Sequence, residues 1–141
     1  MSVDGLLAHG TKWATHAMKT RGHIHGFLAG HMADGSLKVY MSIEGADADE
    51  RAAEAAEARR VMLEAGCAFY VVISESAMWP KDGDRSEAEE VVVVVSCSAE
   101  RAATKILRVV RAESGEVVDL ADAGVEEGAV GTYTGLLGPV N

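Results

Sequence analysis

The sequence predicts an α+β domain in which a mainly antiparallel sheet of five to six strands carries two helices packed on one face. Two segments, 3–20 and 47–65, space their apolar or small residues with a helical period. Several other segments alternate with period two or are rich in β-branched residues, and the connections between them are short enough for antiparallel pairing. We expect one domain over residues 1–141, with 121–141 as a glycine-spaced C-terminal tail.

Residues 3–20 are expected to form the first helix. One arc of this helix carries apolar and small residues, namely Leu6, Leu7, Gly10, Trp13, Ala14, Ala17 and Met18. Gly22 tolerates the left-handed conformation that is common just after a helix, so it is expected to end this one.

A hairpin is expected next, from the period-two pattern that begins at His23. Asp34-Gly35 is a turn signal, and residues 37–44 supply the return strand. A tight turn predicts that Ile24 and Leu28 share the inner face. It also predicts three cross-strand pairs: Leu28 with Met41, Gly26 with Ile43, and Met32 with Leu37.

The second helix has the clearest boundaries. Asp47 followed by Glu50 resembles a capping box, and Gly66 follows the last residue with helical spacing. The alanines between them form a smooth face that lets the helix axis approach a sheet closely.

Four further strands are expected, over 69–76, over 90–98 and in two halves of 104–120 that meet at Ser114-Gly115. The segment 91–95 is five consecutive valines. Such a strand can be buried on both faces, which in a small protein suggests that a second subunit covers one of them.

The chain is acidic, with a formal net charge of −9. This charge repels phosphate backbones and anionic headgroups, so we expect neither a nucleic-acid nor a membrane partner. We find no run of about eighteen apolar residues and no secretory signal, which predicts a cytoplasmic location.

Histidine is the residue with an uneven distribution, since all five lie in the first 31 residues. On a strand, His23 and His25 point the same way at a Cα separation of about 6–7 Å, and the predicted register places Glu44 opposite His25. Two imidazoles and a carboxylate are suitable ligands for a divalent metal. One hypothesis is therefore a metal-dependent enzyme or sensor that uses His23, His25 and Glu44.

The alternative is that these are half-exposed strand residues, with His25 hydrogen-bonded to Glu44, and that no cofactor binds. No H-E-x-x-H, G-x-S-x-G or phosphate-loop motif is present in the sequence. Whether the protein is an enzyme stays open on the sequence alone.

Partner binding is the leading hypothesis, in the form of a non-catalytic domain that associates with itself or with another protein. Trp79 begins an acidic loop and offers a large contact area for a partner; the alternative is that it caps one end of the core. Tyr133 and Leu136 make the tail partly apolar. With the valine strand, these residues predict a homo-oligomer, with a dimer favoured.

One part of the sequence resembles a group of uncharacterised small bacterial proteins. The residues that carry the resemblance are Tyr70 to Glu75 with Trp79, Glu89-Glu90-Val91, then Ile106, Arg108, Arg111 and Gly115-Glu116-Val117. The resemblance covers the C-terminal third of the chain and implies no activity, cofactor or substrate.

Overall fold

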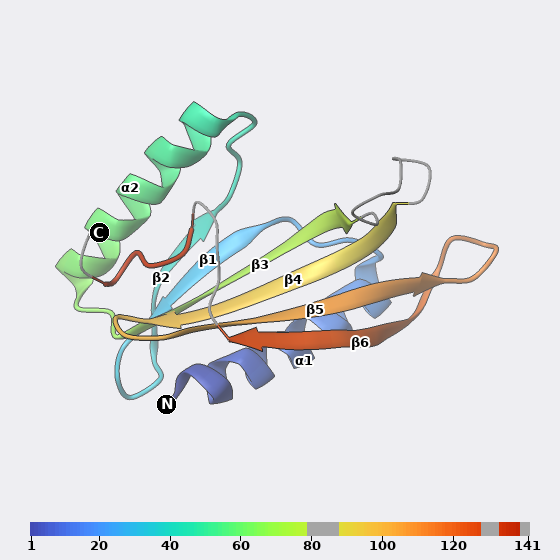
Figure 1. Ribbon diagram of the computed structural model, residues 1–141, viewed down its shortest axis with the longest axis horizontal. Helices are drawn as coiled ribbons and strands as arrows, with labels where there is room; N and C mark the ends of the chain where they lie inside the picture. The colour runs from blue at the N-terminus through green and yellow to red at the C-terminus, as the bar shows by residue number, and fades with distance from the viewer. Residues whose placement is uncertain (79–87, 128–132, 139–141) are drawn as a thin grey trace.

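The computed structural model describes residues 1–78, 88–127 and 133–138 (Figure 1). Two helices and six strands follow one another along the chain: α1 Val3–Arg21, β1 Phe27–His31, β2 Leu37–Ser42, α2 Ala48–Ala65, β3 Phe69–Met78, β4 Glu89–Ser98, β5 Ala102–Arg111 and β6 Val117–Glu127. Neither helix of this described part has the length and apolar character needed to cross a membrane.

All six strands belong to one sheet with the order β2-β1-β3-β4-β5-β6. Every neighbouring pair is antiparallel, and only β1 and β3 are neighbours that are not consecutive in the chain. The hairpin strand β2 and helix α2 lie between those two in sequence. The predicted α+β class with an antiparallel sheet and two helices is confirmed.

Both helices begin and end at the residues that the sequence indicated. The Ser2 side chain accepts a hydrogen bond from the Gly5 N–H at 3.0 Å, and the Asp47 side chain accepts one from the Glu50 N–H at 2.8 Å. Gly22 and Gly66 follow the helices with φ of 81° and 77°. Left-handed backbone of this kind costs little only without a side chain, which explains why glycine ends both helices.

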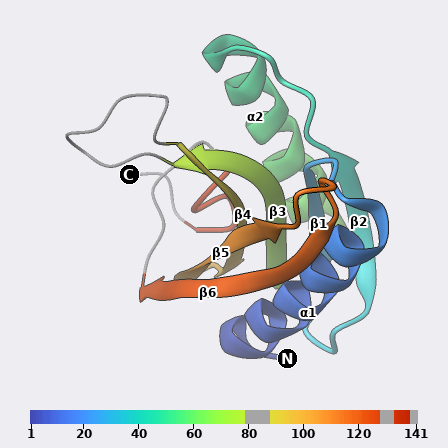
Figure 2. The ribbon, with the colours of Figure 1, turned by 90° about the vertical axis from the view of Figure 1, so that its right-hand side faces the viewer.

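The helices cover opposite faces of the sheet (Figure 2). Buried residues of α1 pack with Val71 and Ile73 of β3, whereas those of α2 pack with Tyr70 and Val72 of the same strand. Neighbouring residues of a strand point to opposite sides, so these pairs lie on different faces. The expectation that both helices share one face is therefore corrected. The central strands are apolar on both sides, with α1 over one side and α2 together with residues 133–138 over the other.

The first hairpin confirms the central pairing that the turn signal predicts. Leu28 lies opposite Met41, and the Ile43 N–H donates to the Gly26 carbonyl at 2.8 Å. Nearer the turn, His31 rather than Met32 is the partner of Leu37, because the register shifts by one residue.

The turn sets the pairing of His31 with Leu37, and the shift itself falls at Lys38, which is an extra residue of β2 between Leu37 and Val39. The Gly35 N–H donates to the Met32 carbonyl at 2.9 Å, and the Met32 N–H donates to the Ser36 carbonyl at 2.9 Å. Gly35 has a φ of 94°. This is a three-residue loop with glycine in the bulge position, one residue longer than the tight turn that the sequence suggested.

Ile24 departs from the predicted alternation. It packs in the α1 cluster, while Leu28 packs in the α2 cluster, so the two residues do not share a face. Strand β1 begins only at Phe27, and the strand alternation does not extend back to Ile24. The Glu75 side chain accepts a hydrogen bond from the Ile24 N–H and holds this connecting segment against β3.

Strand β6 takes in the first part of the predicted tail. Residues 121–127 pair with β5, although they were expected to lie outside the sheet. Gly124, with a φ of 125°, lies opposite Ile106, while the next pair is Leu107 with Asp122. Gly124 therefore adjoins a bulge within β6, whereas the sequence alone suggested that it belongs to a glycine-spaced tail outside the sheet.

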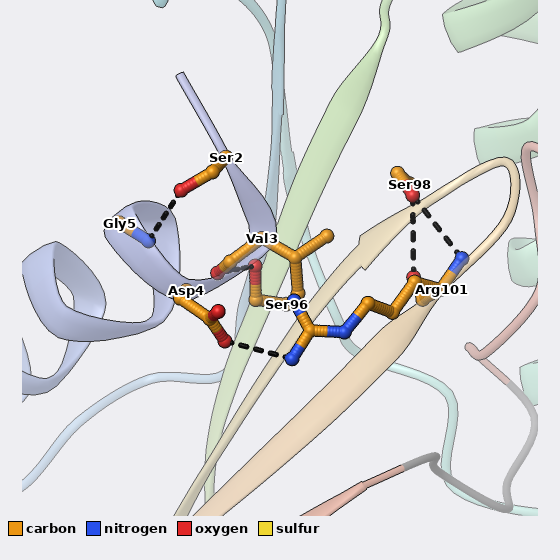
Figure 3. Close-up of polar contacts among 7 residues, drawn as sticks. All are labelled: Ser2, Val3, Asp4, Gly5, Ser96, Ser98 and Arg101. Atoms are coloured by element: carbon orange, nitrogen blue, oxygen red, sulfur yellow. Dashed lines mark hydrogen bonds and ion pairs between the residues drawn. The ribbon is translucent and has the colours of Figure 1, made fainter.

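The start of α1 is tied to the end of β4 by polar contacts (Figure 3). The fully buried Ser96 hydroxyl donates to the Val3 carbonyl at 2.8 Å, and an Arg101 guanidinium nitrogen lies 2.9 Å from the Asp4 carboxylate. The arginine bridge is exposed to solvent, so its contribution is small. The serine bond is shielded from water and fixes where α1 sits on the sheet.

We expect Ser96→Ala to lower the free energy of unfolding by about 1 kcal/mol, because a buried hydrogen bond is lost. Urea unfolding measures this difference. Ser76→Ala, at an exposed position of β3, is the matched control and is expected to change stability by less than about 0.5 kcal/mol. Equal effects of the two substitutions would contradict the assigned role of Ser96.

Candidate functional site

An apolar pocket of about 190 Å3 lies between α1 and the β1–β2 hairpin. Its lining comes from both segments and from β3 below them: His9, Gly10, Trp13, Phe27, Ala29, His31, Leu37, Tyr40, Val71 and Ile73. A Cβ on Gly10 would meet a Val94 methyl group at 3.0 Å. The helix backbone therefore lies close to the sheet at this point, and the larger side chains line the pocket beside it.

Three aromatic rings form a ladder from α1 to the edge of the sheet. The rings of Trp13 and Phe27 meet edge to face, with centroids 4.8 Å apart and planes at 75°. Phe27 then stacks on Tyr40 at 5.2 Å and 23°. Phe27 is buried, but Tyr40 is 60% exposed and Trp13 also reaches solvent. Exposed aromatic surface of this kind is typical of positions that anchor a partner.

The polar groups at the pocket come mainly from two histidines and a tyrosine. His31 Nδ1 lies 3.1 Å from the Gly35 carbonyl, which can only accept, so Nδ1 donates this hydrogen bond. His9 is exposed on α1. The ten lining residues include no carboxylate, thiol or aliphatic hydroxyl. The polar side-chain atoms of this lining are therefore those of His9, His31, Trp13 and Tyr40.

Strand β2, beside the pocket, is one of the two edge strands of the described sheet, and β6 is the other. Leu37 and Tyr40 of β2 are 57% and 60% exposed. An edge strand with exposed apolar side chains is a template for pairing with another chain. Strand β6 also exposes apolar residues, but it carries Asp119 and Asp122 and an internal bulge, which are features that discourage pairing.

Charge is distributed unequally between this side of the molecule and the rest. Residues 1–44 contain four Lys and Arg against three Asp and Glu, together with all five histidines. The other nine basic and nineteen acidic residues lie in 45–141. The first 44 residues, which include α1, β1 and β2, are therefore less acidic than the rest of the chain.

The predicted metal ligands are only partly brought together. His25 Nε2 lies 3.8 Å from the Glu44 carboxylate, so the expected opposition of these two residues is present. Both are exposed, as is His23. Within the described ranges, no three His, Cys, Asp or Glu side chains are grouped so that they could hold a metal ion. Metal binding by His23, His25 and Glu44 stays a prediction, with this geometry supporting only two of the three ligands.

The predicted partner-binding residues have different locations. Trp79 lies outside the described residues. Leu136 is only 8% exposed and packs in the α2 cluster, and Tyr133 packs against the same cluster. The structure therefore gives Tyr133 and Leu136 contacts within the chain.

These contacts are made through buried or partly buried polar groups. The Tyr70 hydroxyl donates to the Tyr133 carbonyl at 2.7 Å and accepts from the Leu136 N–H at 3.1 Å. Arg59 donates to the carbonyls of Leu136 and Gly138, the latter at 2.8 Å. Burial, with Cys97 adjacent, raises the pKa of Tyr70 and keeps its hydroxyl protonated as a donor.

Glu54 joins the same segment to the loop before α2. Its carboxylate accepts from the Tyr133 hydroxyl at 2.6 Å and from the N–H groups of Glu44 and Gly45. Burial opposes ionisation of this carboxyl, but the hydrogen bonds outweigh it and the pKa of Glu54 is lowered. Glu54 is therefore ionised at neutral pH and accepts these bonds as a carboxylate.

The valine strand is β4, in the middle of the sheet. Val92 and Val94 are buried under α1, and Val91 is buried on the other face. Val93 and Val95, on that second face, are partly buried. A subunit covering this face stays a prediction.

The sequence did not predict the pocket. Trp13 was expected in the core arc of the first helix, and no role was expected for Tyr40, which alternates with the apolar residues Val39 and Met41. An aromatic residue on the outer side of a predicted strand is the signal that could have drawn attention to it.

Comparison with known proteins finds no match among family models, curated proteins or solved structures. The resemblance to small bacterial proteins stays a prediction.

Proposed function

We propose that this protein is a non-catalytic association domain that binds a second copy of itself through strand β2 and the aromatic side chains beside it. The observation that carries the proposal is an edge strand with two large apolar side chains, Leu37 and Tyr40, exposed to solvent. The adjoining apolar pocket adds a surface against which side chains of the second copy can pack.

A second copy is the partner that the charges favour. The part of the chain that contains β2 carries a formal charge of +1, against −10 for the remainder. Many weakly basic surfaces would attract an acidic ligand, so this charge alone does not select one. The β2 edge is apolar and nearly neutral in an otherwise acidic protein, and a partner surface of the same kind suits it. Closed two-fold dimers are also the commonest soluble assemblies.

Light scattering of the intact chain over a range of concentrations tests the proposal. We expect a mass that rises toward twice that of one chain, and a Tyr40→Lys variant whose dissociation constant is about 30-fold higher, since an interface anchor contributes about 2 kcal/mol. Val125→Lys is the matched control, because Val125 is 53% exposed on the other edge strand, and its dissociation constant is expected to stay unchanged. Thermal unfolding checks that both variants are folded.

A wild-type chain that stays monomeric at every concentration would overturn the proposal. Equal weakening by the Tyr40 and Val125 substitutions would also do so, because it would show that β2 has no special part in self-association.

A further inference from the structure

We infer that two copies of the chain pair their β2 strands antiparallel about a two-fold axis, so that Lys38 of each copy lies beside Glu44 of the other. This arrangement rests on the proposed self-association and specifies its geometry. It joins two six-stranded sheets into one continuous sheet, with the aromatic ladders of both copies near the axis.

The backbone of β2 limits how the strands can pair. The Ile43 N–H donates to Gly26 of β1, and in an antiparallel ladder the residues that bond to one neighbour alternate with those that face away. Tyr40 and Ser42 therefore turn their N–H and C=O groups to the free edge. The Glu44 N–H is already bonded to the Glu54 carboxylate at 2.9 Å, so the stretch available for pairing ends there.

Charge determines the direction of pairing. Lys38 lies near the start of β2 and Glu44 just beyond its end, and both side chains are exposed. An antiparallel two-fold arrangement brings the lysine of one copy to the glutamate of the other, and does so twice. Parallel pairing in register would instead place like charges together, which is unfavourable between neighbouring strands.

Two registers keep the free backbone groups of Tyr40 and Ser42 facing the second copy and also bring Lys38 toward Glu44 of that copy. An axis beside Tyr40 places Val39 opposite Met41 of the second copy, and an axis beside Met41 places Tyr40 opposite Ser42. Lys38 adjoins this regular stretch as the extra residue at the register shift of β2. In both registers Lys38 at the start of one strand and Glu44 just beyond the end of the other lie at the same end of the paired stretch. Both registers also bring the two Tyr40 rings close together and cover surface that is exposed in one copy. His25, 3.8 Å from Glu44, is the other group beside this carboxylate.

Strand β6 does not offer the same solution. Its Asp119 and Asp122 are exposed acidic side chains. A two-fold pairing of β6 strands would bring acidic groups of both copies together, with no basic residue on the strand to oppose them.

Charge reversal in the intact chain tests the arrangement. Lys38→Glu and Glu44→Lys are each expected to raise the dimer dissociation constant about tenfold, since each places two like-charged pairs at the interface. The double variant, with both reversals, is expected to return to within about threefold of the wild type, because the pairs are restored with exchanged signs. Analytical ultracentrifugation measures all four proteins.

The single variants also separate local pairing from net charge. Lys38→Glu makes the chain two charges more negative and Glu44→Lys makes it two charges less negative, yet both are expected to weaken the dimer. Arg21→Glu and Glu113→Lys repeat these changes at exposed positions away from β2 and are expected to leave the dissociation constant within about twofold of the wild type. Circular dichroism confirms that each variant is folded.

Tightening by Glu44→Lys, or a double variant as weak as the single ones, would overturn the β2–β2 arrangement. A wild-type dimer that is insensitive to both reversals would overturn this arrangement while leaving self-association intact. A wild-type monomer would overturn the proposed function itself, so the two failures can be distinguished.

Discussion

Replacing Leu6 with alanine is expected to lower the free energy of unfolding by about 2–5 kcal/mol. Leu6 lies in α1 and is fully buried against the apolar face of the central strands. The substitution removes apolar contacts and leaves a cavity, because the sheet below and the helix backbone above are both held in place. Chemical denaturation measures this loss. The dependence of the unfolding free energy on denaturant concentration is compared between the variants.

Leu63→Ala is the control for this effect. Leu63 also lies in a helix but is 50% exposed, so its truncation is expected to cost less than about 1 kcal/mol. Similar losses for the two leucines would contradict the packing of α1 on the sheet. A small stable domain typically has about 5–15 kcal/mol of stability, so Leu6→Ala removes a large share of it.

Tyr70→Phe is expected to lower the free energy of unfolding by about 1–3 kcal/mol and to loosen residues 133–138. The change removes one hydroxyl and leaves two partners of the C-terminal segment, the Tyr133 carbonyl and the Leu136 N–H, without their bond to it. Leaving a buried polar group without a partner costs more free energy than an average hydrogen bond contributes to stability. Hydrogen exchange followed by mass spectrometry measures both effects, with faster exchange expected in this segment.

Tyr40→Phe is the matched control, since it removes the same hydroxyl from an exposed ring that keeps its stacking on Phe27. We expect no change in stability beyond about 0.5 kcal/mol and no faster exchange at 133–138. Unaltered exchange in the Tyr70 variant would show that other contacts, such as those of Arg59 and Glu54, hold the segment without it.

The two sides of the sheet thus have different parts in the proposed function. The α2 side is covered in part by the chain's own residues 133–138, which Tyr70, Arg59 and Glu54 bind through hydrogen bonds. The α1 side keeps a pocket and an exposed edge strand. The sequence predicted that the apolar tail binds a partner, whereas residues 133–138 pack within the chain. An apolar tail can cover its own sheet as readily as it can cover another protein.

Local signals in the sequence predicted most of the elements. Asp47, Gly22 and Gly66 act on backbone groups within a few residues of themselves, so their effect on the helix ends does not depend on the rest of the fold. The central pairs of the first hairpin follow from a short turn for the same reason. The bulges at Gly35 and Gly124 were not predicted, because the same glycines are compatible with several turn and strand geometries.

The sequence by itself determined the α+β class, the helix limits and the pairing of Leu28 with Met41, since these depend on periodicity and on caps and turns between near neighbours. Only the tertiary structure decided that the helices lie on opposite faces, that β2 is an edge strand and that Trp13, Phe27 and Tyr40 line one pocket. These features depend on which apolar faces bury each other across long separations in the chain. When a strand is apolar on both faces, its sequence does not specify which helix will cover each face.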